Sequence, residues 1–266
     1  MLSDITLGQY IPAPSLVHKL DPRIKIVSSI VYIVAVFLAK SIFSYAFLLL
    51  ATLCLIKLSK IKLLTVLKGV KPVLFLIIFT AAINIFMTGT GDVWVKFGFL
   101  KITYTGIKMA VTMSLRLVFL VVGTSMLTYT TSPIMLTDGI ESLLKPFSKI
   151  GLPSHELAMM MTIALRFIPT LLEETDKIIK AQKARGADFE SGNIINRAKA
   201  LMPVLVPLFI NSFRRADELA MAMECRCYRG GEGRTRLKEL RITGVDYKAM
   251  FVVFIFVTLI CILNIV

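Results

Sequence analysis

Long runs without charge constrain the fold of this chain more than any other feature. Between Lys25 and Lys57 lie 31 residues interrupted by a single charge, Lys40. A helix needs about 20 apolar residues to cross the hydrocarbon core of a bilayer. With 56% hydrophobic residues, 18% charged residues and a mean hydropathy of +0.77, the composition excludes an ordinary soluble enzyme, a disordered chain and a secreted disulfide scaffold. The sequence therefore predicts a polytopic membrane protein.

Basic residues decide how many helices the first apolar run contains. Lysines and arginines cluster before this run and again after it, at 57–71. Short loops rich in Lys and Arg stay on the cytoplasmic side, so both clusters belong on one side of the membrane. A hairpin that turns near Lys40 meets this requirement, whereas one over-long helix does not. We therefore predict two short helices, at about 24–39 and 42–57.

Three further spans complete the predicted membrane part. The third runs from Pro72 to about Gly91, the fourth covers about 106–130, and the last is 249–266. A glycine-rich stretch with alternating apolar residues follows the third span. It predicts an outward loop or a small hairpin, with Trp94 at the membrane interface. Five spans place the N-terminus inside and the C-terminus outside.

Arg116 is a charge inside the fourth span, where charges are costly. One interpretation is structural: the side chain snorkels or pairs within the bundle. The other is functional, as for many intramembrane charges. The sequence leaves both open.

The distribution of charge predicts the domain organisation. Residues 131–248 carry 18 Lys/Arg and 14 Asp/Glu, which is too much charge for a lipid environment. We therefore expect an N-terminal membrane domain at 1–130 with about four transmembrane helices, a domain outside the bilayer at 131–244, and a C-terminal transmembrane helix at 245–266. The charged block at 131–248 is expected to be cytoplasmic.

Two long amphipathic helices are predicted in the charged block, after a shorter amphipathic stretch at about 132–149. In the first, apolar residues recur at steps of three and four from Ser154, a plausible N-cap, to Ala184. Gly186 suits the left-handed position just after a helix end. The second begins at Asn193 and ends near Cys225.

Each long helix finishes in an arginine, Arg185 or Arg226, that is flanked by small residues. A basic residue in the last turn complements the helix dipole, which is the simplest interpretation. Alternatively, small neighbours clear space for another surface, and a guanidinium with five rigid donors suits a pocket lined by carboxylates or helix C-termini on a second protein. Both interpretations remain possible.

The other side chains of these helices suggest packing or contact surfaces rather than a catalytic site. Glu173 and Glu174 are most simply solvated. Methionines such as Met160 and Met161 indicate either an adaptable, sliding surface or ordinary core packing.

No catalytic residue and no metal site is predicted. The chain has no Gly-x-x-x-x-Gly-Lys-Ser/Thr phosphate loop. His18 and His155 lack a metal-binding context, and Cys225 and Cys227 do not have the spacing of common zinc or thioredoxin-like sites.

Several motifs along the whole chain belong together. They are Leu7–Tyr10, Ser15–Arg23, the basic turn Lys57–Lys71, Leu165–Pro169, Ala184–Gly186 and the tract Ala222–Thr235. With these motifs the sequence resembles the transmembrane T component of energy-coupling factor (ECF) transporters, the vitamin-importing branch of the ABC systems. The two arginine motifs are the most specific part of the resemblance.

The resemblance implies an all-α membrane protein with a cytoplasmic coupling domain of one short and two long helices. In such transporters two cytoplasmic ABC ATPase subunits hydrolyse ATP, a membrane-embedded S component captures the vitamin, and the T component couples them. The implied partners are these subunits and the lipid bilayer of a bacterial cell membrane, and no nucleic acid. The chain is expected to be non-catalytic and to hold no cofactor, because ATP and Mg²⁺ bind to the ATPases.

The resemblance also assigns site residues. Ala184, Arg185 and Gly186 match the first ATPase-docking motif directly. Cys225, Arg226 and Cys227 stand at the second, which is usually Ala-Arg followed by a small residue. Closure of the ATPases is expected to move both helix tips, and the long helices to transmit that movement to the S component. The implied contacts with the S component are Met160, Met161, Leu205 and Phe209.

Other functions are less favoured by the residues. A T component dedicated to cobalt, nickel or biotin is the nearest alternative. A membrane-embedded enzyme is disfavoured because the predicted spans lack Asp, Glu and His. A secondary transporter or channel commonly carries intramembrane polar sites, and only Arg116 and Asn84 approach this pattern.

Overall fold

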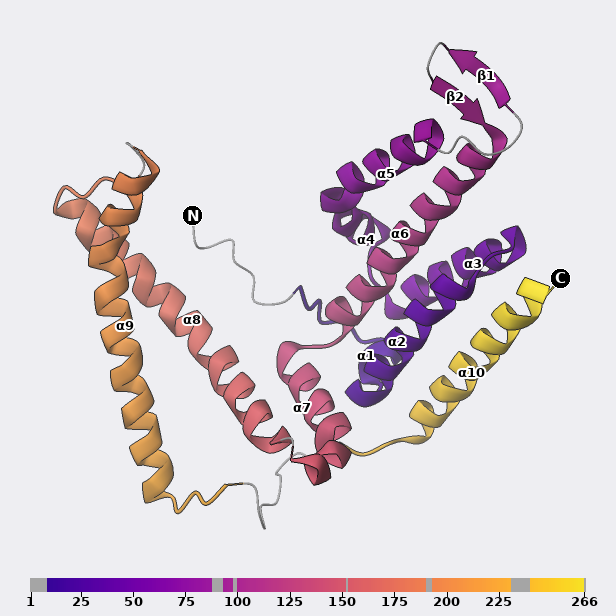
Figure 1. Ribbon diagram of the computed structural model, residues 1–266. Coiled ribbons are helices and arrows are strands. Elements are labelled where there is room, and N and C mark those ends of the chain that lie inside the picture. Colours follow the sequence, from indigo (N-terminus) through magenta and orange to yellow (C-terminus); the bar gives the residue numbers. More distant parts are fainter. Residues whose placement is uncertain are drawn as a thin grey trace. The chain divides into compact units, whose positions relative to one another are not determined.

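A computed structural model describes residues 9–87, 93–97, 100–151, 153–189, 193–230 and 240–265. The chain forms two units, Gly8–Ile140 with Leu240–Val266, and Glu141–Glu239. The first division falls within a helix, Pro133–Leu144, and therefore later than the boundary that the charge distribution indicated after residue 130. The elements in chain order are α1 (Leu16–Lys19), α2 (Pro22–Leu38), α3 (Ile42–Ser59), α4 (Leu63–Val70), the 3₁₀ turn η1 (Lys71–Val73), α5 (Leu74–Met87), β1 (Val93–Phe97), β2 (Leu100–Thr103), α6 (Tyr104–Thr130), α7 (Pro133–Leu144), the 3₁₀ turn η2 (Lys145–Ile150), α8 (Ser154–Ala184), α9 (Ile194–Cys225) and α10 (Gly244–Ile265) (Figure 1).

The first apolar run forms two antiparallel helices, α2 and α3, which confirms the predicted hairpin. Asp21 caps α2 and Pro22 fills its first position, where a missing N–H costs nothing. The turn at Lys40 is held by Asn264 near the end of α10, whose Oδ1 accepts from the Lys40 N–H at 3.0 Å. The hydroxyls of Tyr32 on α2 and Thr52 on α3 lie 3.0 Å apart. This bond fixes one helix against the other.

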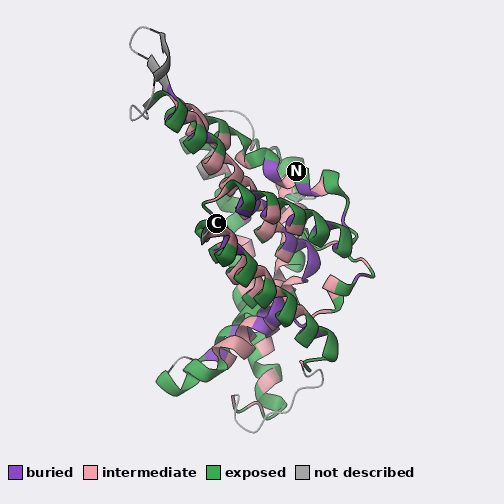
Figure 2. Cartoon of the chain, turned by 90° about the vertical axis from the view of Figure 1, so that its right-hand side faces the viewer, coloured by how far each residue is buried: buried purple, intermediate pink, exposed green. Residues whose placement is uncertain are grey.

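The buried core of this unit is small. Helices α2, α3, α6 and α10 meet around Val36, Leu48, Phe119 and Ile260, which are at most 5% exposed. Many other helical residues are exposed, as the green segments of the cartoon in Figure 2 show, and many of these are large and apolar. A helix that is apolar on all sides is stable where lipid covers the outer face.

The third span differs from the prediction. The basic turn expected at 57–71 contains a helix, α4, and the apolar helix α5 begins at Leu74 rather than Pro72. Lys71 and Pro72 form the 3₁₀ turn η1 between them, because proline is tolerated at the start of a helical segment. The chain is therefore helical almost continuously from α4 through α5.

The glycine-rich stretch contains the predicted small hairpin. Strands β1 and β2 pair antiparallel, with Phe97 opposite Leu100. The side chain of Trp94, which was expected at the membrane interface, lies outside the described residues. Thr103 then caps α6, its Oγ1 accepting from the Gly106 N–H at 3.2 Å.

The second unit contains the two predicted long helices, α8 and α9, of 31 and 32 residues. Pro169 lies inside α8, and Pro203 and Pro207 lie inside α9, without ending either helix. The expected cap at Ser154 is wrong, since Pro153 occupies the N-cap position and Ser154 begins the helix. Asn193 does occupy the N-cap position of α9, but its side chain makes no capping bond.

The described part of the chain has five helical stretches long and apolar enough to cross a bilayer. They are Ile42–Ser59, Leu63–Phe86, Tyr104–Thr130, Ser154–Ala184 and Gly244–Asn264. The number of such helices agrees with the predicted five spans, but the helices are not all the same ones. Helix α8 is long and apolar enough, whereas α2, with 17 residues, is too short by this measure. Helix α8 is the least apolar of the five, with a mean hydropathy of 1.2 against 1.8 to 2.2. The fold is that of an all-α, multi-pass membrane protein with one small hairpin.

Candidate functional site

The C-terminal end of α8 has a defined cap. Arg185 is the C-cap residue, and Gly186 follows in the left-handed region at φ +88°. The Gly186 N–H donates to the Lys183 carbonyl, and the Ala187 N–H donates to the Gln182 carbonyl, both at 3.0 Å. These two bonds form a Schellman motif, which satisfies carbonyls at the end of a helix. The predicted left-handed role of Gly186 is confirmed.

The C-terminal end of α9 repeats this geometry. Arg226 is the C-cap residue, and Cys227 follows at φ +57°. The Cys227 N–H donates to the Glu224 carbonyl at 2.8 Å, and the Tyr228 N–H donates to the Met223 carbonyl at 3.0 Å. A residue with a Cβ is strained in this region, so the second cap is the weaker of the two.

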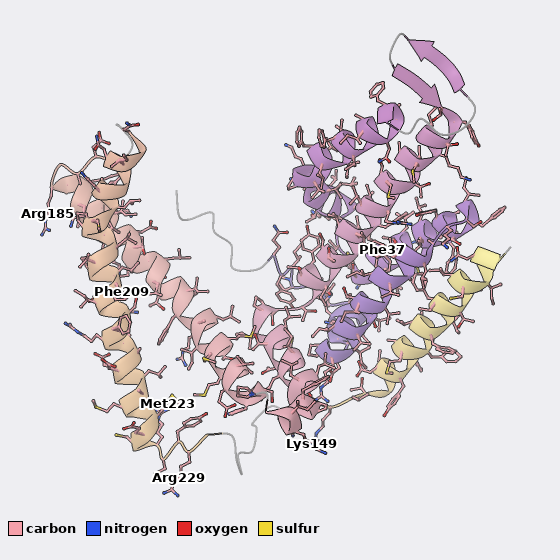
Figure 3. All side chains as sticks on the ribbon, viewed as in Figure 1. Phe37, Lys149, Arg185, Phe209, Met223 and Arg229 are labelled. Carbon is pink, nitrogen blue, oxygen red and sulfur yellow. The ribbon has the colours of Figure 1, made fainter. Side chains whose placement is uncertain are left out.

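The two arginines therefore hold the same position of the same cap. Both side chains are exposed, and Arg185 lies at the very end of α8 (Figure 3). Across the described ranges of the chain, no hydrogen bond or ion pair engages either guanidinium. The charge of each suits the C-terminal end of a helix dipole, and the N–H donors of each guanidinium are exposed.

Helices α8 and α9 run antiparallel, so the two caps lie at opposite ends of the pair (Figure 1). Glu174 on α8 contacts Asn211 and Arg215 on α9, while earlier on α8 Met159 accepts a hydrogen bond from Tyr228, just beyond α9. At a rise of about 1.5 Å per residue, a helix of the length of α9 spans roughly 48 Å. The two caps are therefore two separate places on the molecule.

Glu174 clamps the two helices together. Its Oε1 accepts from Asn211 Nδ2 at 2.5 Å, and its Oε2 accepts from an Arg215 amino group at 2.7 Å. The Glu174 side chain is 17% exposed, so the expectation that it is solvated is wrong, whereas its neighbour Glu173 is exposed. Sequence reasoning missed this clamp because the pattern of one helix does not identify its partner on another.

The four residues assigned to the S component form two separate groups. Met160 and Met161 are 56% and 43% exposed, and Leu205 and Phe209 are 55% and 65% exposed. The methionines lie beside Met159, at the end of the pair where α9 finishes. Leu205 and Phe209 lie one helical turn apart, close to the level of the Glu174 clamp. From Met160 to Glu174 is 14 residues of α8, or roughly 21 Å, and Leu205 and Phe209 lie beyond the level of Glu174, so more than about 20 Å separates the two groups.

Both histidines make polar contacts with nearby residues. His18 Nδ1 lies 2.6 Å from Ser15 Oγ, and its Nε2 lies 2.9 Å from the Ile11 carbonyl oxygen. His155 Nδ1 lies 3.1 Å from Glu141 Oε1. Among the residues that the structure describes, no group of three or more His, Cys, Asp or Glu is placed to hold a metal ion.

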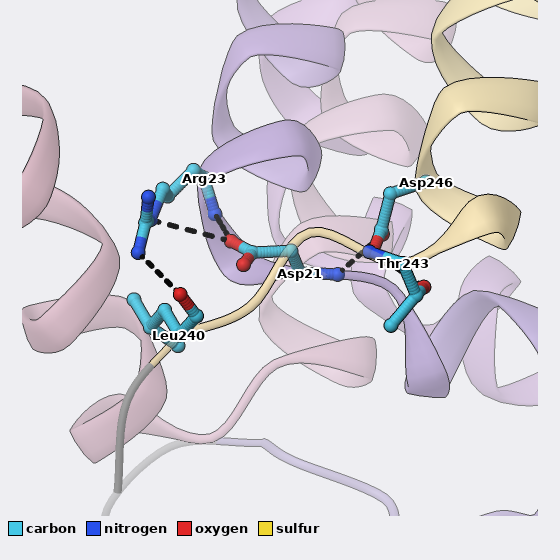
Figure 4. Close-up of polar contacts among 5 residues, drawn as sticks. All are labelled: Asp21, Arg23, Leu240, Thr243 and Asp246. Atoms are coloured by element: carbon cyan, nitrogen blue, oxygen red, sulfur yellow. Dashed lines mark hydrogen bonds and ion pairs between the residues drawn. The ribbon is translucent and has the colours of Figure 1, made fainter.

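A buried polar network joins the starts of α2 and α10 (Figure 4). Asp246, 1% exposed, accepts from the Asp21 N–H at 2.8 Å and from both the N–H and the hydroxyl of Thr243 at 2.7 Å. Arg23 donates to the Leu240 carbonyl at 3.0 Å. This network gives a structural role to the Asp21–Arg23 motif. The signal for Asp246 was the Thr-x-x-Asp spacing of a capping box.

Arg116 lies over the ring of Phe37, with the guanidinium carbon 5.5 Å from the ring centroid. Its Nε is buried and has no hydrogen-bond partner in the described part of the molecule. A cation–π contact stabilises the charge inside the helix bundle. The structural interpretation of Arg116 is therefore favoured within this chain.

Comparison with known proteins identifies the family. Residues 13–237 match the CbiQ family, described as "Cobalt transport protein". Proteins named "Energy-coupling factor transporter transmembrane protein EcfT" are 62% identical in Clostridium kluyveri (94% of this chain, 93% of the relative), 56% in Ruminiclostridium cellulolyticum (97% and 96%) and 48% in Bacillus subtilis (92% and 93%). On these matches, the chain belongs to the EcfT family, the transmembrane T components of energy-coupling factor transporters.

Proposed function

We propose that this chain is the coupling subunit of an ECF-type ABC importer. It transmits the ATP-driven movement of two cytoplasmic ATPase subunits to a membrane-embedded S component that carries a vitamin or another micronutrient. The observation that carries the proposal is that two arginines occupy the same position of the same type of helix cap, at opposite ends of one helix pair joined by Glu174. The names of the relatives support the same role.

Each cap docks one ATPase subunit. The guanidiniums of Arg185 and Arg226 are exposed and offer planar donors to carboxylates or to carbonyls at the ends of helices. Small flanking side chains allow another surface to approach closely. Because the caps are tens of ångströms apart, each ATPase receives one of them. The docking residues are Ala184, Arg185 and Gly186 for one subunit, and Cys225, Arg226 and Cys227 for the other.

The exposed apolar side chains of α8 and α9 receive the S component. Met160 and Met161 form one contact, and Leu205 and Phe209 form the other. Methionine adapts to surfaces of different shape, which suits partners that exchange. The clamp at Glu174 keeps the two contacts at a fixed separation, so movement at a cap reaches both.

The arrangement in the membrane follows from the charges. The N-terminus and residues 131–248 face the cytoplasm of a bacterial cell, and the C-terminus lies outside, because basic residues flank the inner ends of the spans. Helix α8 is apolar enough to span, yet it carries Glu156, Arg166 and the Glu174 clamp, which support a place outside the hydrocarbon core. The chain is non-catalytic in this proposal, since the ATPases bind ATP and Mg²⁺.

The experiment replaces both cap arginines by glutamate, Arg185→Glu with Arg226→Glu, in the complete transporter. We expect the ATPases to be lost on purification and vitamin uptake to fall to background, because the charge is reversed at both docking points. Arg214→Glu is the matched control, since Arg214 is also exposed on α9 but lies away from the caps. If the double variant keeps both ATPases and normal uptake, arginine docking is wrong.

A second candidate is a T component dedicated to one substrate, cobalt, nickel or biotin. The description of the matching family model favours it. Copurification from native membranes separates the two possibilities. Several different S components indicate a shared module, and a single one indicates a dedicated transporter.

A further inference from the structure

A cavity of about 290 Å³ lies between α1 and the end of α3. Three lysines line it, Lys19, Lys57 and Lys60, together with Ser15 and the apolar side chains of Leu16 and Leu58. Among the residues that the structure describes, no carboxylate belongs to the lining. Its volume is close to the lower end of the range for small-molecule sites, about 300 Å³. The cavity therefore concentrates positive charge without neutralising it.

The three ammonium groups are free for a ligand. None of the lysine side chains makes a hydrogen bond or an ion pair with any residue that the structure describes, and all three are exposed. The one nearby acid in the sequence, Asp21, is committed elsewhere, since its Oδ1 accepts from the Arg23 N–H at 2.9 Å. Within the described part of the chain, the three lysine side chains therefore have no counter-ion and no hydrogen-bond partner.

The backbone at this place is in an unusual conformation. Lys60 ends α3 with φ +58°, in the left-handed region that side chains with a Cβ rarely adopt. Among the described non-glycine residues, only Cys227 shares this feature. Strained positions of this kind often accompany functional sites. Here the left-handed turn brings Lys60 to the cavity beside Lys57.

The position of the cavity indicates the kind of ligand. It lies just before the start of α2 and at the end of α3, two antiparallel apolar helices, so it lies at the level where lipid headgroups meet water. Leu16 and Leu58, 58% and 48% exposed, provide an apolar border to the lysines. Basic pockets at the ends of membrane helices bind anionic lipid headgroups.

We propose that this cavity is a binding site for one anionic phospholipid, whose phosphate is bound by Lys19, Lys57 and Lys60. The acyl chains lie against Leu16 and Leu58. The lipid fixes α1 against the end of α3, at the membrane surface. This site does not depend on the proposed transport role.

The test uses the purified full-length protein and native mass spectrometry. The probes are phosphatidylglycerol and phosphatidylcholine, added in separate titrations. The pocket variant combines Lys19→Gln, Lys57→Gln and Lys60→Gln. The control variant combines Lys62→Gln, Lys68→Gln and Lys71→Gln, which removes the same charge from exposed lysines that do not line the cavity.

We expect one tightly bound phosphatidylglycerol in the natural protein and in the control variant. The pocket variant is expected to bind it on the order of 100-fold more weakly, about fivefold for each lysine. Phosphatidylglycerol is also expected to raise the melting temperature of the natural protein and not that of the pocket variant.

Three results would overturn the proposal. An equal loss of phosphatidylglycerol affinity in the pocket and control variants would indicate only a general attraction between lysines and anionic lipid. Equal binding of phosphatidylcholine and phosphatidylglycerol would mean that the lysines do not select an anionic headgroup. Displacement of the lipid by millimolar inorganic phosphate would identify a site for free phosphate instead.

Discussion

Replacing Glu174 by alanine is expected to separate α8 from α9 without disturbing either helix. The change removes both acceptors of the clamp, the one for Asn211 at 2.5 Å and the one for Arg215 at 2.7 Å. A hydrogen bond to a charged group contributes about 1.5 kcal/mol or more, and a partly exposed ion pair such as that of Arg215 about 0.5 kcal/mol. Together, the loss for the helix pair is about 2 kcal/mol.

Hydrogen exchange measures this loss directly. Backbone amides that exchange through separation of the two helices should exchange roughly 30-fold faster, which corresponds to about 2 kcal/mol. Glu174→Gln keeps an oxygen that accepts from Asn211 and loses the charge opposite Arg215, so we expect the exchange rate to rise only about threefold. In the complete transporter, Glu174→Ala should lower vitamin uptake for each ATP hydrolysed, because the helices no longer move together.

Glu173→Ala is the control for this prediction. Glu173 is the adjacent carboxylate and is exposed, so its removal should leave exchange unchanged. If Glu174→Ala and Glu173→Ala exchange at the same rate in α8 and α9, the clamp does not hold the helices together and the reasoning is refuted.

Four further changes act on the caps and on the membrane unit. Residues 186 and 227 both adopt the left-handed backbone conformation, which glycine tolerates best. Gly186→Ala should therefore destabilise the end of α8 by about 1 kcal/mol, and Cys227→Gly should stabilise the end of α9 by a similar amount. Hydrogen exchange of the backbone amides in the last turn of each helix measures both effects. Asp246→Asn should lower the melting temperature of the purified protein, since both carboxylate oxygens accept and an amide has only one accepting oxygen. Either the Asp21 N–H or the Thr243 donors then face an NH2 group, and the loss is about 1–3 kcal/mol. Gly123→Ala should also lower the melting temperature, because a methyl group at this position overlaps the ring of Tyr32. The expected loss in the free energy of unfolding is about 1–3 kcal/mol.

The two changes in the membrane unit each have a matched comparison. Asp217→Asn alters an exposed carboxylate, and Gly244→Ala adds a methyl group with no atom within 4 Å, so neither is expected to lower the melting temperature. A melting temperature of Asp246→Asn or Gly123→Ala equal to that of its comparison variant would contradict the prediction. Slower exchange in Gly186→Ala would contradict the left-handed cap.

The membrane helices were largely predictable because their signals are local. The charge at Lys40 and the basic residues around it were enough to predict α2 and α3 as separate helices. The end of α8 was equally clear, since Gly186 directly follows Arg185. Helix α4 was missed because the lysines around it indicated a turn, although the residues between Lys62 and Lys68 are mainly apolar and continue into helix.

Contacts between distant segments were not predictable from one sequence. Glu174 and Glu173 look alike in the sequence, and only the position of Arg215 distinguishes them. Asp246 belongs to the charged block by composition, yet it is buried against the start of α2. The same holds for the cavity, where Lys19 meets two lysines from a later helix.

The antiparallel direction of α8 and α9 has a geometric consequence. A half-turn about an axis normal to the plane of the pair exchanges α8 with α9 and brings the C-terminal end of each helix to the place of the other. Both of these ends carry an arginine in the same Schellman cap. The two ends of this helix pair are therefore near-equivalent in backbone geometry, although they belong to one chain. The pair reproduces the symmetry of a dimer with one copy of the polypeptide.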